Sequence, residues 1–282
     1  MTDNKKYKTL DIIRFNEDKP DEVILPQEVC NIEFKNGASL SLLASKLFVQ
    51  LVNVVGSDIV KPKRHAVPYS ALNWANRDKE QIRNAVLELI STTVHIQKEE
   101  SEHIGTILND VKRDYDEYSG GIEFKFSDVF IEIVKNSRLW ATISAQAVLL
   151  MECKYSIWLY QMLAPRKNLK SLTAFELSLD DLKTRLGATN KSYKDWFTFK
   201  QRVLEPAIEE INFLTDVLIS YETVKRSRWV VAVKFFVVSK SKDEQVEVLK
   251  EHQKSRLGRK ERKQVYSQER KQMFASLLKT FD

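Results

Sequence analysis

Residues 199–215, "FKQRVLEPAIEEINFLT", have the pattern of an amphipathic helix that carries a proline in its middle. The apolar residues recur at helical spacing and form one stripe: Phe199, Val203, Ala207, Ile211 and Leu214. In an ordinary helix interior, Pro206 would remove a backbone donor and cost about 3 kcal/mol. Basic residues precede Pro206, whereas acidic residues surround and follow it. The proline therefore either kinks one helix or marks the start of its second half.

The residues around this helix predict a definite order of elements. Downstream, "VLISYETV" and "WVVAVKFFVV" are typical of strands, and the basic turn "KRSR" joins them. Upstream, "LSLDDLKTRLG" predicts a short helix with Ser178 as N-cap and Gly187 as C-cap. "KYSIWLYQML" predicts a further helix before it. The predicted order is therefore helix, short helix, long helix and β-hairpin.

The first half of the chain shows the same order. An apolar helix stripe over residues 40–54 ends at Gly56, and a basic loop follows. "PYSALNW" then predicts a short helix entered by Pro68, and a longer helix starts after Asn76. "TTVHIQ" and "GGIEFKFS" predict the strands of a hairpin, with a polar interruption at Asn109 and Asp110, and "DVFIEIVKN" predicts a closing helix.

A repeated unit of this kind predicts two tandem winged-helix domains, each a helix-turn-helix followed by a β-hairpin wing. The fold class is α+β and mostly helical. We expect a flexible N-terminal arm at 1–23, a first winged-helix domain at 24–136, a second at 137–240 and a basic helical C-terminal tail at 241–282. Such domains place a helix in the DNA major groove and use the wing on phosphates. A winged helix that contacts only protein is the alternative.

The charge of the chain favours an anionic partner. Its net charge is +6, with an isoelectric point near 9.1. Residues 240–282 hold twelve Lys or Arg against seven Asp or Glu, a surplus of +5, which leaves +1 for the rest. Any DNA-binding surface on the body is therefore a local patch. The tail itself is either a clamp on DNA phosphates, a partner-binding helix broken once at Gly258, or a mobile solubilising segment.

Basic and polar residues occupy the positions that a winged helix presents to DNA. In the second domain, the N-terminal half of the long helix carries four of them opposite the apolar stripe. Lys200 lies nearer that stripe and would have to extend outward. The predicted DNA-contacting residues are Lys194, Thr198, Lys200, Gln201 and Arg202 on the helix, Lys225, Arg226 and Arg228 on the wing, and Lys61, Lys63, Arg64, Lys79 and Arg83 in the first domain.

The sequence holds no pattern typical of an active site. It has no GxGxxG, phosphate-binding loop or GxSxG pattern, and its four histidines include no close pair for a metal. We therefore expect no catalytic residue, no metal and no cofactor, and the missing histidine pair argues against the alternative of a nicking nuclease. Cys30 and Cys153 form no CxxC pair, which favours a reducing cytoplasmic setting. We find neither a signal peptide nor an apolar run of the roughly 18–20 residues that spans a membrane.

Three segments carry a resemblance to a known family: "KYSIWLYQML", "LSLDDLKTRLGA" and "FKQRVLEPAIEEINFLTDVLISYE", in that order. They resemble the iteron-binding plasmid replication initiators of the Rep_3 family, and "RVLEPAIEEIN" is close to the hallmark of that family. The resemblance covers roughly residues 24–240. It is similar in residues in the second half and mainly in pattern in the first.

The resemblance implies a protein that binds directly repeated origin DNA, opens an adjacent AT-rich region and recruits the host initiator and the replicative helicase. It also implies a homodimer in equilibrium with a monomer, repression of its own promoter by the dimer, and conversion by chaperones. In this family the first domain holds the dimer contact, and the residues matching Lys200, Gln201 and Arg202 contact bases. A two-domain transcriptional regulator without initiator activity is the alternative with the same fold.

Two positions depart from the pattern of that family. Gln201 stands where a third basic residue is common, and an amide at this position is suited to reading adenine. The wing turn "KRSR" lacks the frequent glycine. Both departures concern which DNA sequence is bound.

Overall fold

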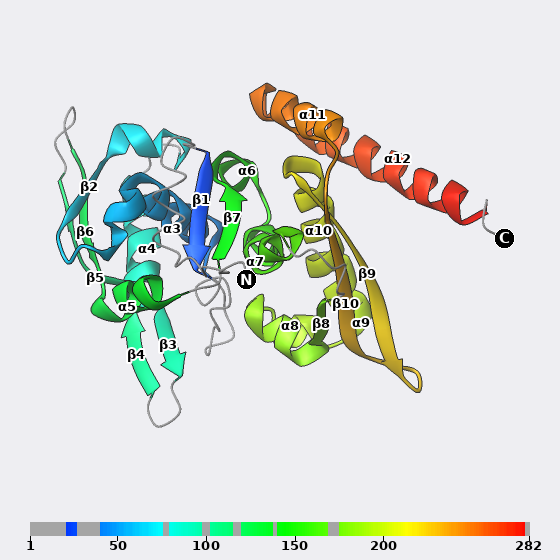
Figure 1. Cartoon of the computed structure of the whole chain (residues 1–282), viewed down its shortest axis with the longest axis horizontal. Coiled ribbons are helices and arrows are strands. Elements are labelled where there is room, and N and C mark those ends of the chain that lie inside the picture. Colours follow the sequence, from blue (N-terminus) through cyan, green and yellow to red (C-terminus); the bar gives the residue numbers. More distant parts are fainter. Residues whose placement is uncertain are drawn as a thin grey trace, which may run out of the picture.

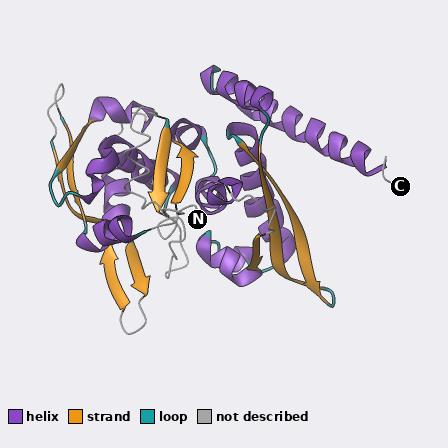
Figure 2. Ribbon diagram, in the orientation of Figure 1, coloured by secondary structure: helices purple, strands orange, loops and turns teal. Residues whose placement is uncertain are grey.

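The computed structural model describes residues 21–26, 40–75, 79–97, 102–114, 120–137, 140–168 and 175–279. Two halves lie on either side of a central helix, α7 (Lys154–Leu163), as Figure 1 shows. The two three-stranded sheets lie at the outer edges of the halves, with helices between them (Figure 2). Most of the predicted N-terminal arm, and Cys30, lie outside the described residues.

The first half contains the elements that the repeat predicts, together with a further hairpin. Its elements are β1 (Glu22–Pro26), α3 (Leu42–Val55), the 3₁₀ helix η1 (Gly56–Val60), β2 (His65–Pro68), the 3₁₀ helix η2 (Tyr69–Ala75), α4 (Lys79–Ser91), β3 (Thr93–Gln97), β4 (Glu102–Thr106), β5 (Leu108–Arg113), β6 (Gly121–Phe126) and α5 (Asp128–Asn136).

The second half and the tail continue this order. Their elements are β7 (Trp140–Ser144), α6 (Ala145–Leu150), α7, the 3₁₀ helix η3 (Ala164–Asn168), β8 (Phe175–Ser178), α8 (Leu179–Arg185), the 3₁₀ helix η4 (Lys191–Tyr193), α9 (Trp196–Phe199), the π-helical turn η5 (Lys200–Leu204), α10 (Glu205–Leu214), β9 (Val217–Arg226), β10 (Trp229–Ser239), α11 (Lys242–Gln253) and α12 (Arg259–Lys279). β7 pairs with β1, so strands from the beginning and the middle of the chain form one ribbon.

The sheets confirm two winged-helix units with the same topology. The strand order is β2-β6-β5 in the first half and β8-β10-β9 in the second. In each, the short strand before the helix-turn-helix pairs antiparallel with the last strand of the wing. Strands β2 and β8 have only four residues each, too few for an alternating pattern, and the sequence did not predict them.

The wing of the first half differs from the predicted hairpin. The segment "TTVHIQ" forms β3 and pairs with β4, whereas the segment "GGIEFKFS" forms β6 and pairs with β5. The predicted polar interruption at Asn109 and Asp110 is wrong, because both residues belong to β5. β5 is an edge strand, and its register with β6 shifts between Leu108 and Asp110, so Asn109 occupies an exposed bulge.

The helix with the internal proline is continuous but irregular. Residues 196–214 run through α9, the π turn η5 and α10 without interruption. In the π turn, the backbone N–H of Glu205 donates to the carbonyl of Lys200, five residues earlier. Pro206 comes directly after this wider turn, in the first turn of α10, where a missing N–H costs little. This agrees with Pro206 marking the start of the second half of the helix.

The central helix α7 is buried on all its faces, which is typical of a core helix. The indole N–H of Trp158 donates to Ser45 Oγ of α3 at 3.1 Å. The hydroxyl of Tyr160 accepts from the backbone N–H of Ser144 at 3.1 Å. One continuous hydrophobic core therefore extends from the first half through α7 into the second.

The helical run Leu42–Val60 is long and apolar enough to cross a membrane by length and composition alone. This corrects the expectation that the chain has no such run. In the structure, α3 packs its apolar side chains into the core of the first half, where Leu47, Phe48 and Leu51 are fully buried. Core helices of this kind pass the same composition test.

The C-terminal tail packs against the second domain. Ser241 and Glu244 form a capping box at the start of α11, and the guanidinium of Arg262 contacts both carboxylate oxygens of Glu251. Tyr266 of α12 lies on Phe213 of α10, with ring centroids 5.6 Å apart. The interpretation of the tail as a mobile segment is therefore wrong for the part whose side chains are described. The helix break near Gly258, where φ is +74°, is confirmed.

The carboxylate of Glu210 connects α10 to the start of α7. It is 2% exposed, and its two oxygens accept the backbone N–H groups of Glu152 at 2.8 Å and Cys153 at 3.0 Å. A negative charge at a helix N-terminus also interacts favourably with the helix dipole. The acidic residues after Pro206 therefore include one that is built into the core.

Replacing Glu210 with Ala removes the buried carboxylate that accepts two part-buried backbone N–H groups at the start of α7. We expect the free energy of unfolding to fall by about 2–4 kcal/mol, since each hydrogen bond to a charged group is worth more than a neutral one. Urea denaturation of the full chain measures this loss. Glu247→Ala is the control, because Glu247 is exposed and pairs with the exposed Lys250. Equal and small losses in the two variants would show that the Glu210 contact is unimportant.

Candidate nucleic-acid interface

The N-terminal half of the long helix in the second domain has a buried face and an exposed face. Asp195 caps its first turn by accepting the backbone N–H of Thr198 at 2.8 Å, and this bond lowers the pKa of the Asp195 carboxyl. Phe199 and Val203 are fully buried, whereas Gln201 and Arg202 are exposed. The predicted separation of apolar and polar faces is therefore present. The cap fixes the direction in which the exposed side chains project.

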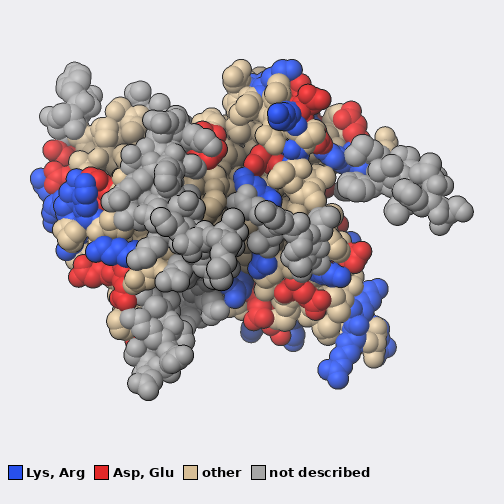
Figure 3. Space-filling view, in the orientation of Figure 1, with Lys and Arg blue, Asp and Glu red and all other residues tan. Residues whose placement is uncertain are grey.

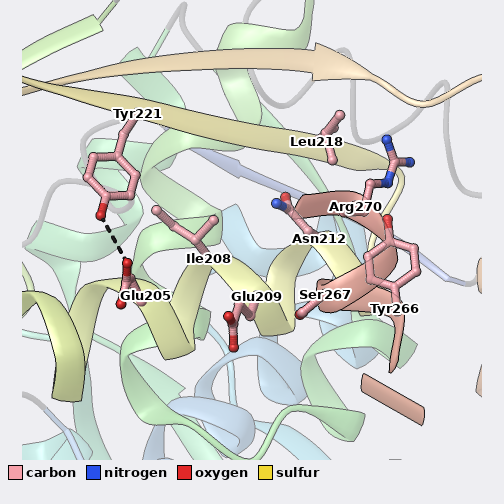
Figure 4. Close-up of a pocket in the computed structure, with 9 residues that line it drawn as sticks. All are labelled: Glu205, Ile208, Glu209, Asn212, Leu218, Tyr221, Tyr266, Ser267 and Arg270. Carbon is pink, nitrogen blue, oxygen red and sulfur yellow. Dashed lines mark hydrogen bonds between the residues drawn. The ribbon is translucent and has the colours of Figure 1, made fainter. Parts of the chain in front are cut away.

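Lys200 occupies a different setting from its neighbours. Its ammonium lies 3.4 Å from Glu205 Oε1, and the hydroxyl of Tyr221 donates to the same carboxylate oxygen at 3.5 Å. Burial raises the pKa of Tyr221, so that hydroxyl stays protonated. Glu205 and Tyr221 also line a cavity of about 150 Å³ between α10, β9 and α12 (Figure 4). Lys200 would have to leave Glu205 to reach a base.

The wing of the second domain is a long hairpin with a basic tip. Arg226 pairs with Trp229 across a two-residue turn formed by Ser227 and Arg228. Ser227 has φ +57°, a left-handed conformation that favours glycine. Lys225, Arg226 and Arg228 are all exposed. Figure 3 shows Lys and Arg gathered at this tip.

Apart from Lys200, the predicted DNA-contacting cations of the second domain have no acidic partner among the residues that the structure describes. No ion pair joins a carboxylate to any of five residues at the helix and the wing: Lys194, Arg202, Lys225, Arg226 and Arg228. These side chains are exposed and positively charged at neutral pH. Their charge is therefore available to phosphate groups.

Four of the five predicted DNA-contacting cations of the first domain are paired with carboxylates. Lys61 and Lys63 both contact Asp58, with a distance of 2.6 Å for Lys63, and these contacts lower the pKa of Asp58 to about 2. Arg64 pairs with Asp110 of β5. Arg83 on α4 lies 3.1 Å from Glu80. Lys79 begins α4, and its side chain lies outside the described part of the structure.

Two exposed aromatic residues at this surface were missed by the sequence analysis. Phe197, in the first turn of α9, and Trp229, beside the wing turn, are each 69% exposed. The guanidinium of Arg228 lies 5.7 Å from the centre of the Trp229 ring. The apolar pattern could have identified Phe197, because it lies off the stripe that contains Phe199. Trp229 fits an ordinary strand and gave no such signal.

The described residues contain no group of three or more His, Cys, Asp or Glu side chains placed to hold a metal ion. The structure shows instead two winged-helix units. In the second unit, the helix of residues 196–214, the reading helix, has an exposed basic N-terminal half, and the β9–β10 wing has an exposed basic tip. This combination defines a DNA-binding protein of the tandem winged-helix class.

Comparison with known proteins identifies the family. Residues 28–164 match the family model described as "Initiator Replication protein, WH1", and residues 178–237 match the one described as "Initiator Rep protein, WH2". The chain therefore belongs to the Rep_3 family of plasmid replication initiator proteins.

Among solved structures, the chain resembles the crystal structure of the Pi initiator protein in complex with iteron DNA. The TM-score is 0.58 at 21% sequence identity, and the match covers 79% of this chain and 99% of that one. At this identity the likeness establishes the shared fold. No curated protein sequence matches this chain.

The contrast between paired and unpaired arginines predicts different effects on DNA binding. We expect Arg202→Ala to weaken binding to the specific site by about 1–3 kcal/mol, the worth of a good base contact. The matched control is Arg83→Ala, which we expect to cost less because Arg83 already neutralises Glu80. Titration of labelled duplex DNA measures both. Equal losses on specific and random DNA would make Arg202 a phosphate contact rather than a base contact.

The left-handed backbone of Ser227 in the wing turn predicts that glycine at this position stabilises the chain. A left-handed φ costs an L-residue roughly 1–2 kcal/mol, whereas glycine adopts it freely, so Ser227→Gly should raise the stability of the chain by about 0.5–1 kcal/mol. Thermal unfolding measures the change. Ser220→Gly, in the interior of β9, is the control and should destabilise the chain. A lower melting temperature for Ser227→Gly would show that Ser227 is not strained.

Proposed function

We propose that this chain initiates plasmid replication by binding directly repeated DNA, the iterons, through its two winged helices. The observation that carries the proposal is the exposed, unpaired set of cations on the α9–η5 helix and the β9–β10 wing, in a chain of the initiator Rep family. A solved structure with the same fold is titled as an initiator in complex with iteron DNA, which supports the same partner.

The finer steps follow from what is expected of the family. The bound monomers promote opening of the origin and recruit the host initiator and the replicative helicase. A homodimer, converted to monomer by chaperones, represses the promoter of its own gene, and the first domain holds the dimer contact. The protein acts in the cytoplasm, where the plasmid is, without a cofactor and without an active site of its own.

The second domain makes the stronger DNA contacts in this proposal. Its unpaired cations release counterions from DNA without first breaking an ion pair within the protein. The first domain contributes weaker backbone contacts, since Lys61, Lys63 and Arg64 exchange Asp58 and Asp110 for phosphate. Exposed ion pairs are worth only about 0–1 kcal/mol, so this exchange costs little.

DNase footprinting of the full chain on its own replicon tests the proposal. We expect protection of several directly repeated sites, spaced by whole helical turns, beside an AT-rich segment. A plasmid that carries this origin should then replicate only when the gene for this chain is present. Protection of a promoter alone, with no support of replication, would favour a transcriptional regulator. Absence of any protected repeat would overturn the initiator assignment.

A further inference from the structure

Two aromatic rings stand out on the surface that carries the unpaired cations. Among the side chains that the structure describes, Phe197 and Trp229 are the only aromatic ones in the exposed class, each 69% exposed. Single apolar residues on a protein surface are ordinary. Here, however, both rings lie on the two elements that a winged helix presents to DNA, the reading helix and the wing.

The position of Phe197 is set by its helix. The short helix α9 contains three aromatic residues, of which Phe199 is buried and Trp196 packs against the core, with their ring centroids 6.1 Å apart. Phe197 projects to solvent instead. Phe197 lies one turn before Gln201 on the continuous helix of α9 and η5, and both side chains are exposed.

The chemistry of a phenyl ring restricts what it can recognise in the major groove. The ring has no donor or acceptor for the polar edges of the bases. The one apolar group that the four bases display in this groove is the C5-methyl of thymine. Among the groups that base edges display in the major groove, a phenyl ring on the exposed face of α9 is therefore suited to that methyl group.

We propose that Phe197 forms a subsite for the C5-methyl group of a thymine, beside the base pair that faces Gln201. The inference rests on the proposed function, because it requires that α9 and η5 enter the major groove of a specific site. It adds a sequence preference to that function. Phe197 contacts the methyl group of thymine at one position of the repeat, and Gln201 and Arg202 form hydrogen bonds with the neighbouring bases.

Trp229 supplies an internal comparison. It adjoins the wing turn, and a wing lies over the sugar–phosphate backbone or the minor groove. Neither surface displays the thymine methyl, which lies in the major groove. Loss of the Trp229 ring should therefore weaken binding without changing the response to that methyl group.

The experiment begins with the full chain and a pool of random-sequence duplexes, from which bound sequences are selected. The enriched duplex is then synthesised with deoxyuridine in place of each thymidine, one position at a time, which removes a single methyl group. We expect one position at which this change weakens binding of the unaltered protein by about 3- to 10-fold, the effect of losing one buried methyl contact.

Variants assign that methyl response to a residue. Phe197→Ala should bind the thymidine and deoxyuridine duplexes equally, whereas Phe197→Leu should retain part of the difference, because leucine still offers an apolar contact. Trp229→Ala should weaken binding to both duplexes by the same factor. Thermal unfolding of each variant checks that the exposed substitution leaves the fold intact.

The outcomes separate this inference from the proposed function. If no sequence is enriched, the proposed function fails and the subsite fails with it. If a sequence is enriched but contains no thymine in its core, or every deoxyuridine duplex binds as the parent does, the subsite is overturned while the function stands. If Phe197→Ala still binds the thymidine duplex more tightly than the deoxyuridine duplex, another residue contacts the methyl group, and the subsite is overturned.

Discussion

The junction between α6 and α7 is held by side chains from three separate parts of the chain. Glu210 of α10 accepts the N–H groups of Glu152 and Cys153, and Lys46 of α3 donates to the carbonyl of Leu149 at 2.7 Å. Arg256, between the two tail helices, donates to the carboxylate of Glu152 at 2.6 Å. Burial lowers the pKa of Lys46 to about 8 in spite of the nearby Glu210 charge. The first domain, the reading helix and the tail are therefore all joined to residues 149–153, the segment between α6 and α7.

This junction explains how a helix with an internal proline keeps a defined direction. The half after Pro206 is fixed at Glu210 and by its buried apolar face. The π turn η5 absorbs the irregularity and carries Gln201 and Arg202 outward. The two halves form one continuous helix, so the position of Gln201 and Arg202 depends on how the half after Pro206 is packed in the core. The described part of the tail packs near the C-terminal end of α10, away from the wing tip (Figure 1).

Much of the fold could be predicted from the sequence because its signals are local. The Ser178 cap, the glycine at position 187 and the apolar stripe of residues 199–214 each specify their own element. The pairing of strands in the first domain could not be predicted, since β3 and β5 both alternate weakly and register depends on distant partners. Four-residue strands carry too little pattern to be recognised.

The residue types at the candidate interface could be predicted from the sequence, but which of their charges form ion pairs could not. The structure places the predicted lysines and arginines on the helix, wing and loop except for Lys194, which precedes the N-cap Asp195 and lies outside the helix. The pairing of the first-domain cations with Asp58, Asp110 and Glu80 depends on the folded geometry. The burial of Glu210 and its hydrogen bonds to the start of α7 could not be predicted either, because an acidic residue on an amphipathic helix is usually solvated. An exposed aromatic residue can be recognised only after the core that excludes it is known.

The central claim is that the α9–η5 helix and the tip of the β9–β10 wing form the main contact with specific DNA. Hydrogen–deuterium exchange of the full chain, measured with and without its selected duplex, tests this most directly. The account predicts the strongest protection by DNA at residues 194–202 and 225–229, with weaker protection in the loop of Lys61, Lys63 and Arg64. Protection confined to the first domain or to α12, with none at residues 194–202, would contradict it.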